Sequence, residues 1–145
     1  MTTSAPFGGK ALIADTSAWH RAPARPVHDE WGRALAGGQI ATTPAVVLEL
    51  LYSTRDAADF DAWETELRLL REVPITRSVT RAAVAALRTL AHAGPLRHRV
   101  PAVDALVAAA AQDAGLGVLH YDRHFDRLAT VLDFESVWIA PPDSL

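Results

Sequence analysis

Short apolar runs alternate along this chain with longer segments whose apolar residues recur every three or four positions. The short runs are typical of strands buried on both faces, and the longer segments are typical of amphipathic helices. We expect strands over residues 11–15, 39–42, 73–76, 118–121 and 137–140. We expect helices over residues 27–36, 43–54, 57–71, 78–92, 101–115 and 123–132. This alternation predicts a three-layer α/β/α sandwich built on a short, mostly parallel five-stranded sheet.

The length of 145 residues, half of them hydrophobic, suits one domain with its own core. We expect residues 1–10 to be a flexible leader and residues 11–145 to form that single domain. No segment resembles a signal peptide or reaches the length of a membrane span. The absence of cysteine excludes disulfides and thiolate chemistry and agrees with a reducing cytoplasm, the location that we expect. With a net charge of -3, any contact with nucleic acid must be local.

Five acidic residues stand apart from the others by their position. Asp15 and Asp122 follow expected strands, and Asp126 comes one turn after Asp122. Glu49 lies among apolar residues, and Asp104 lies in the first turn of an otherwise apolar helix. Taken singly, each has an ordinary explanation as a helix cap, a dipole partner or an exposed side chain. Because ligands of parallel α/β sheets bind at the carboxyl ends of the strands, we expect the acids at strand ends and helix starts to share one rim.

Carboxylates that converge on one rim repel one another and therefore bind cations or protons. Oxygen donors with few imidazoles favour Mg²⁺ or Mn²⁺. Zinc is a weaker alternative: His120 and His124 are four residues apart, but a strand-to-helix junction separates them. The chain has no P-loop, no GxGxxG and no GxSxG, so nucleotide-binding and serine-hydrolase chemistries lack support.

Four segments, taken in their order, resemble a known family. They are DTS after the first strand, P-x4-E on the second helix, P-x2-DALVAAAA on a late helix and YDRHFDRL after the fourth strand. This pattern, spread over residues 11 to about 140, resembles the PIN domain, specifically the VapC-type toxins of bacterial toxin-antitoxin pairs. The resemblance implies a metal-dependent endoribonuclease that cuts a cellular RNA such as tRNA or rRNA. It also implies silencing by a VapB-type antitoxin and assembly as a homodimer.

The resemblance assigns roles to particular residues. Those that match the acidic quartet holding the metal are Asp15, Glu49, Asp104 and Asp122. Ser17 matches a hydroxyl that supports the first of these acids, and Asp126 matches an auxiliary acid.

Three arginines near the expected rim are candidates for binding RNA phosphates. Arg97 and Arg99 precede the helix that carries Asp104, and Arg123 follows Asp122. The alternative is that they are ordinary solvated loop arginines. Two other functions remain open: a non-catalytic PIN-type binding module, and a DNA-directed nuclease of the flap-endonuclease type.

Overall fold

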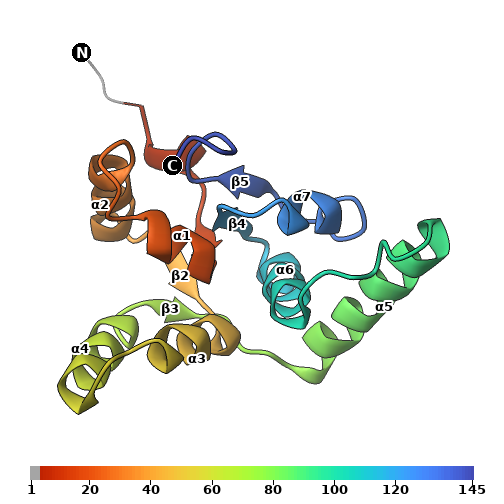
Figure 1. The fold of residues 1–145 in the computed structure, drawn as a ribbon, viewed down its shortest axis with the longest axis horizontal. Coiled ribbons are helices and arrows are strands. Elements are labelled where there is room, and N and C mark those ends of the chain that lie inside the picture. The colour runs from red at the N-terminus through yellow and green to blue at the C-terminus, as the bar shows by residue number, and fades with distance from the viewer. Residues whose placement is uncertain (1–3) are drawn as a thin grey trace.

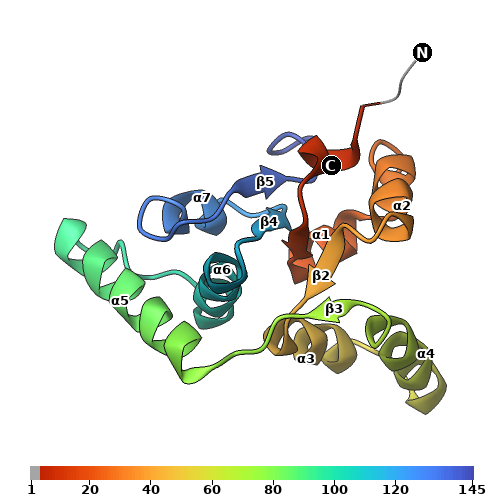
Figure 2. The same cartoon turned by 180° about the vertical axis from the view of Figure 1, so that it is seen from behind.

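The computed structural model describes residues 4–145 and has helices on both faces of a central sheet (Figures 1 and 2). The strands are β1 (Leu12–Ala14), β2 (Ile40–Thr42), β3 (Arg71–Glu72), β4 (Gly117–His120) and β5 (Ser136–Trp138). The α-helices are α1 (Thr16–Arg21), α2 (His28–Ala36), α3 (Pro44–Tyr52), α4 (Ala57–Leu67), α5 (Arg77–Ala93), α6 (Ala102–Ala114) and α7 (His124–Leu128). A short 3-10 helix, η1 (Pro6–Gly9), precedes β1.

Within this described range the sheet has five strands in the order β3-β2-β1-β4-β5, and each neighbouring pair is parallel. Ile13 of β1 is aligned with Ala41 on one side and with Val118 on the other. From β1 the chain builds outward through β2 and β3, and then crosses to the other side of β1 to form β4 and β5. The order of the strands therefore reverses between β1 and β4, which is where ligand sites of open parallel sheets are found.

The two faces of the sheet have separate hydrophobic cores because successive strand side chains point to opposite sides. Ile13 and Val118 pack in a core with residues of α3, α5, α6 and α7. Leu12 and Leu119 pack in the other core, with residues of α1 and α2. The predicted three-layer α/β/α arrangement is therefore confirmed.

Several element boundaries differ from those expected. The third strand was expected over residues 73–76, but β3 is Arg71–Glu72. The backbone N–H of Val73 still donates to the carbonyl of Thr42 (2.8 Å), and Pro74, which has no N–H, cannot continue the ladder. The fifth strand begins one residue earlier than expected and ends at Trp138.

Helix α1 is present in the structure but was not predicted from the sequence. It has 6 residues, too few for an apolar periodicity to be recognised. Asp15 begins it as the N-cap, accepting a hydrogen bond from the backbone N–H of Ser17. The first strand therefore ends at Ala14, one residue earlier than expected.

Residues 4–10 lie against α2 and the start of β2. The backbone N–H of Phe7 donates to Glu30 (3.0 Å), and the side-chain amide of Gln39 donates to the carbonyls of Pro6 (2.9 Å) and Lys10 (3.0 Å). Residues 1–3 of the expected leader lie outside the described residues. The flexibility of residues 1–10 stays a prediction.

No helix among residues 4–145 combines the length and the apolar character that crossing a membrane requires.

Candidate active site

The carboxyl ends of β1 and β4 lie side by side, and an acidic residue follows each of them within two positions. Asp15 follows β1, and its backbone N–H donates to the carbonyl of Leu119 in β4 (2.9 Å). Asp122 comes two residues after the end of β4. Both acids therefore stand at the reversal point of the strand order, as expected from their positions in the sequence.

Asp15 is buried and held by its neighbour Ser17. Its Oδ2 accepts hydrogen bonds from the backbone N–H (3.1 Å) and the hydroxyl (2.7 Å) of Ser17. The same hydroxyl oxygen accepts the backbone N–H of Tyr121 (2.9 Å), so it links the ends of the two strands. Burial raises the pKa of Asp15, the hydrogen bonds from Ser17 oppose that rise, and the charge of Glu49 adds to it. Oδ1 of Asp15 is buried and has no hydrogen-bond partner among the described residues.

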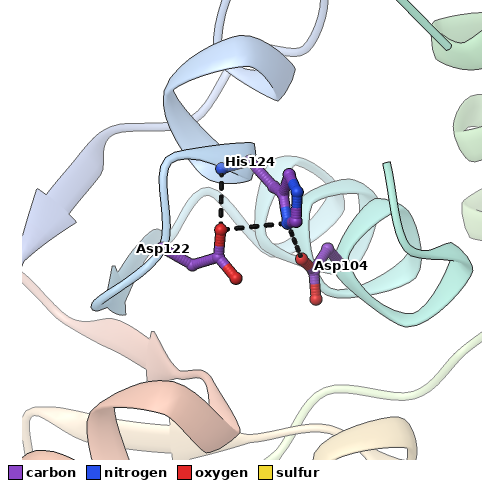
Figure 3. Close-up of side chains that lie close together, drawn as sticks. All are labelled: Asp104, Asp122 and His124. Carbon is purple, nitrogen blue, oxygen red and sulfur yellow. Dashed lines mark hydrogen bonds and ion pairs between the residues drawn. The ribbon is translucent and has the colours of Figure 1, made fainter. Parts of the chain in front are cut away.

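Asp104 and Asp122 meet at the side chain of His124 (Figure 3). Asp104 comes from the first turn of α6, and His124 is the first residue of α7. Nδ1 of His124 lies 3.2 Å from Oδ2 of Asp104 and 2.9 Å from Oδ1 of Asp122. The backbone N–H of His124 also donates to Oδ1 of Asp122 (3.0 Å). These three side chains can each offer one ligand atom within 4.8 Å of the others.

The protonation of Asp104 reflects the charges around it. Its pKa is raised to about 7, first by burial and then by the charges of Asp15 and Asp122, while His124 acts in the opposite direction. A shift in this direction combines the burial of the carboxyl with repulsion from carboxylates close to it. The charges of Asp15 and Asp122 both act on Asp104, so these three acids lie near one another.

Glu49 lies at the outer margin of these three acids. It projects from α3 and is exposed, and its Oε1 accepts a hydrogen bond from the hydroxyl of Thr16 (2.8 Å). Its charge contributes to raising the pKa of Asp15, so it is close to the buried acids. The sequence does not predict the contact between Thr16 and Glu49, because the two residues are 33 positions apart.

Asp126 is directed toward β5 and away from the three clustered side chains. Its two carboxylate oxygens accept the indole N–H of Trp138 (3.2 and 3.0 Å), and Oδ1 also accepts the hydroxyl of Ser136 (2.8 Å). Both carboxylate oxygens of Asp126 are therefore engaged with residues of β5, and its auxiliary role stays a prediction.

The two histidines considered for zinc have separate partners. His120 is fully buried, and its Nε2 lies 2.7 Å from the hydroxyl of Ser136, whereas His124 faces Asp104 and Asp122. Burial lowers the pKa of His120 to about 4, against the charges of Asp126 and Asp122. The arrangement does not support a zinc site that uses both rings. The position of His124 beside the acids was missed, because its separation from Asp122 does not reveal the turn that brings the ring back.

The three arginines differ in their partners. Arg97 and Arg99 are exposed in the segment between α5 and α6. Arg123 is exposed and forms an ion pair with Asp143 (2.8 Å), and this hydrogen bond and the charge of Asp143 raise the pKa of Arg123.

Taken together, the fold and these contacts define a parallel α/β domain with a buried acidic site at the reversal of its strand order. A family model described as PIN domain matches residues 12–131. The chain belongs to the PIN domain family.

Two curated relatives share this chain's sequence over most of its length. This chain is 40% identical over 135 residues to Ribonuclease VapC18 of Mycobacterium tuberculosis. The matched segment covers 92% of this chain and 98% of the relative. It is 33% identical over 108 residues to Ribonuclease VapC51 of the same organism, covering 74% of this chain and 77% of the relative.

Two solved structures share its fold at lower sequence identity. The DNA-bound VapBC of Salmonella typhimurium superimposes with a TM-score of 0.70 at 13% identity, covering 90% of this chain and 99% of that chain. VapBC2 of Rickettsia felis, bound to a promoter DNA fragment, superimposes with a TM-score of 0.64 at 15% identity, covering 87% and 98%.

Proposed function

We propose that this protein is a metal-dependent endoribonuclease, the toxin of a toxin-antitoxin pair. The observation that carries the proposal is the convergence of Asp104 and Asp122 beside the buried Asp15. The 40% identity to a protein named Ribonuclease VapC18, over nearly the whole of both chains, supports RNA as the substrate.

The donor set fits a hard divalent cation. Asp104 and Asp122 present carboxylate oxygens, and Oδ1 of Asp15 is buried without a hydrogen-bond partner among residues 4–145. A buried carboxylate oxygen without a partner is unfavourable unless a proton or a cation balances it. Mg²⁺ and Mn²⁺ prefer such oxygen ligands and retain several waters.

In this proposal Asp15, Asp104 and Asp122 hold the ion, with Glu49 at the outer margin. A bound divalent ion would supply an activated water and would neutralise charge on the scissile phosphate. The chain's own contribution is orientation. Ser17 fixes Oδ2 of Asp15 and leaves Oδ1 free, and Thr16 fixes one oxygen of Glu49. His124 holds Asp104 and Asp122 together through Nδ1.

Arg97 and Arg99 are proposed to bind phosphates that flank the cut. They are exposed in the segment that leads to Val100 and into α6, which carries Asp104. Arginine suits this task because its planar guanidinium grips phosphate bidentately. Arg123 would have to exchange its ion pair with Asp143 for a phosphate. A cellular RNA substrate implies an activity in the cytoplasm.

The proposed partners are a VapB-type antitoxin and a second copy of this chain. The antitoxin follows from the likeness to VapC relatives. The homodimer stays a prediction, and exposed apolar side chains one turn apart on α3 support it: Leu48 is 68% exposed and Tyr52 is 91% exposed.

A non-catalytic binding module is the alternative. A scaffold gains nothing from acids whose burial and mutual repulsion raise the pKa of Asp104, so the electrostatics favour catalysis. A DNA-directed nuclease is less favoured, because the relatives at 40% and 33% identity are named ribonucleases.

The test incubates the purified protein with structured RNAs and with duplex DNA in Mg²⁺, Mn²⁺ or EDTA. We expect RNA cleavage that needs the ion and that disappears in the Asp104→Asn variant. Asp113→Asn, on the exposed part of the same helix, is the matched control and should cleave like the wild type. Cleavage of DNA alone, or metal-independent cleavage, would contradict the proposal.

A further inference from the structure

A chain of hydrogen bonds connects the carboxylate of Asp126 to the backbone of Asp122. The hydroxyl of Ser136 donates to Oδ1 of Asp126 (2.8 Å). Nε2 of His120 lies 2.7 Å from that hydroxyl oxygen. At the other side of the ring, Nδ1 of His120 accepts the backbone N–H of Asp122 (3.1 Å). His120 is therefore the link between a carboxylate outside the acidic site and an acid within it.

The contacts determine which nitrogen of His120 carries the proton. A backbone N–H can only donate, so Nδ1 must be an acceptor without a proton. The hydroxyl hydrogen of Ser136 is used on Asp126, so the oxygen of Ser136 accepts from Nε2–H. Each of the three hydrogen bonds then has its donor on the side of Asp122 and its acceptor on the side of Asp126. The charge of Asp126 therefore polarises all three bonds in the same direction.

The surroundings of His120 fix the plane of its ring. Its side chain is fully buried, lies stacked against Phe125 (ring centroids 4.9 Å apart) and meets Trp138 edge-on at the same distance. His120 on β4 is aligned with Trp138 on β5, whose indole N–H donates to Asp126. The ring therefore has one orientation, and all its polar atoms are satisfied within the described residues.

We propose that His120 is a positioning residue of the acidic site: locked as the Nε2–H tautomer by Ser136 and Asp126, it holds the backbone of Asp122 so that its carboxylate faces Asp104. The inference rests on the proposed function, because the value of this placement is in binding the ion. Groups that orient metal ligands from outside typically change metal affinity or activity by 10–100-fold when they are altered.

Two variants of His120 separate positioning from packing. In His120→Asn, the side-chain carbonyl oxygen occupies about the place of Nδ1 and can still accept the N–H of Asp122. In His120→Gln, the longer amide reaches Ser136 instead and leaves the N–H of Asp122 without an acceptor. Both variants have a neutral side chain and both disturb the core. If His120 served packing alone, the two variants would lose amide protection and Mn²⁺ affinity to a similar extent. Ser144→Ala, which removes an exposed hydroxyl of the C-terminal segment, is the control.

The first readout does not require activity. In the wild type, nitrogen NMR of the imidazole should show a proton on Nε2 only, and the amide proton of Asp122 should be protected from exchange. That protection should persist in His120→Asn and be lost in His120→Gln. A wild-type ring protonated on Nδ1 overturns the inference even if both variants fail to fold.

The second readout is the Mn²⁺ concentration that half-saturates the rise in melting temperature. We expect a midpoint within about threefold of the wild type for His120→Asn and Ser144→Ala, and at least about tenfold higher for His120→Gln. Equal midpoints for the two His120 variants would overturn the positioning role. A wild type that binds no Mn²⁺ and cleaves no RNA would refute the proposed function instead, whatever the tautomer.

Discussion

The hydroxyl of Ser17 joins two strands by donating to Oδ2 of Asp15 at 2.7 Å while accepting the N–H of Tyr121 at 2.9 Å. Replacing Ser17 with alanine would leave a part-buried backbone N–H and a buried carboxylate each short of one partner. We expect Ser17→Ala to lower the free energy of unfolding by about 1–3 kcal/mol, measured by urea denaturation.

A second serine provides the control for that measurement. Ser53 donates its hydroxyl to the carbonyl of Leu50 at the exposed end of α3. Ser53→Ala should change the free energy of unfolding by no more than about 0.5 kcal/mol. Equal losses in the two variants would show that the link between Asp15 and Tyr121 adds nothing beyond an ordinary hydroxyl.

The stability of the metal-free protein should depend on the ionisation of Asp104. Its pKa is about 7 in the folded chain, against an ordinary value of 3.8, so the folded state binds the proton more tightly than the unfolded state. The contribution of Asp104 to stability is therefore greatest below about pH 4 and is lost as the pH rises through about 7. Asparagine does not ionise, so the Asp104→Asn variant does not lose stability in this way as the pH rises.

Melting temperatures of wild type and Asp104→Asn in EDTA test this expectation. The variant should be the more stable protein at pH 8, by on the order of a few kcal/mol, and its advantage should shrink toward pH 4. The pKa of His120 is lowered to about 4, so its contribution to stability is lost as the pH falls. Because His120 is present in both proteins, this contribution cancels in their comparison. A variant less stable than the wild type at pH 8 would contradict the assigned repulsion.

Arg97 and Arg99 are expected to bind RNA through phosphates alone. Each replacement by alanine should weaken RNA binding to a similar extent for all sequences and reduce the slope of log affinity against log salt by about 1. Binding is measured with Asp104→Asn so that the RNA stays intact. Arg88→Ala, an exposed change of equal charge on α5, should leave the slope unchanged. If Arg88→Ala changed the slope as much as the Arg97 and Arg99 variants do, RNA binding would depend on the overall charge of the protein and not on a site at these two arginines.

Gly117 and Gly32 should respond in opposite directions to replacement by alanine. A Cβ at Gly117 would lie 2.7 Å from the Leu12 side chain and 2.9 Å from the backbone oxygen of Glu135, so we expect a loss of about 1–3 kcal/mol. At Gly32, on α2, nothing lies within 4 Å, and alanine should stabilise the helix by up to about 1 kcal/mol. Thermal unfolding of both variants measures the difference, and a stabilised Gly117→Ala would contradict the tight packing of β4.

Much of the fold could be predicted because burial leaves a pattern along the chain. The alternation of apolar runs and helical segments indicated the sheet and its two covering layers. The third strand was predicted at the wrong residues and α1 was not predicted, and both errors have local causes. Pro74 lacks the N–H that a ladder needs, and α1 depends on the cap supplied by Asp15. Neither cause repeats along the sequence, so neither produces a periodic signal.

Asp15 and Asp122 could be selected in advance because a carboxylate after a buried strand is unusual, and Glu49 and Asp104 because each lies in an otherwise apolar helix. The resemblance indicated Ser17 as a partner of Asp15, but the other partners could not be selected. His124 was separated from Asp104 by 20 positions, and its ring reaches that acid only because α7 turns back over α6. The engagement of Asp126 with Trp138 likewise depends on how β5 lies beside β4.

By itself, the sequence determined the layered fold and the edge of the sheet at which Asp15 and Asp122 stand, because these follow from hydrophobic periodicity and from the chain's direction through parallel strands. Only the tertiary structure decided which hydrogen bond each side chain makes, which carboxylate is buried deeply enough to retain a proton near neutrality, and which imidazole faces which acid. Those properties depend on distances of a few ångströms between segments far apart in the chain, and no local pattern encodes such distances.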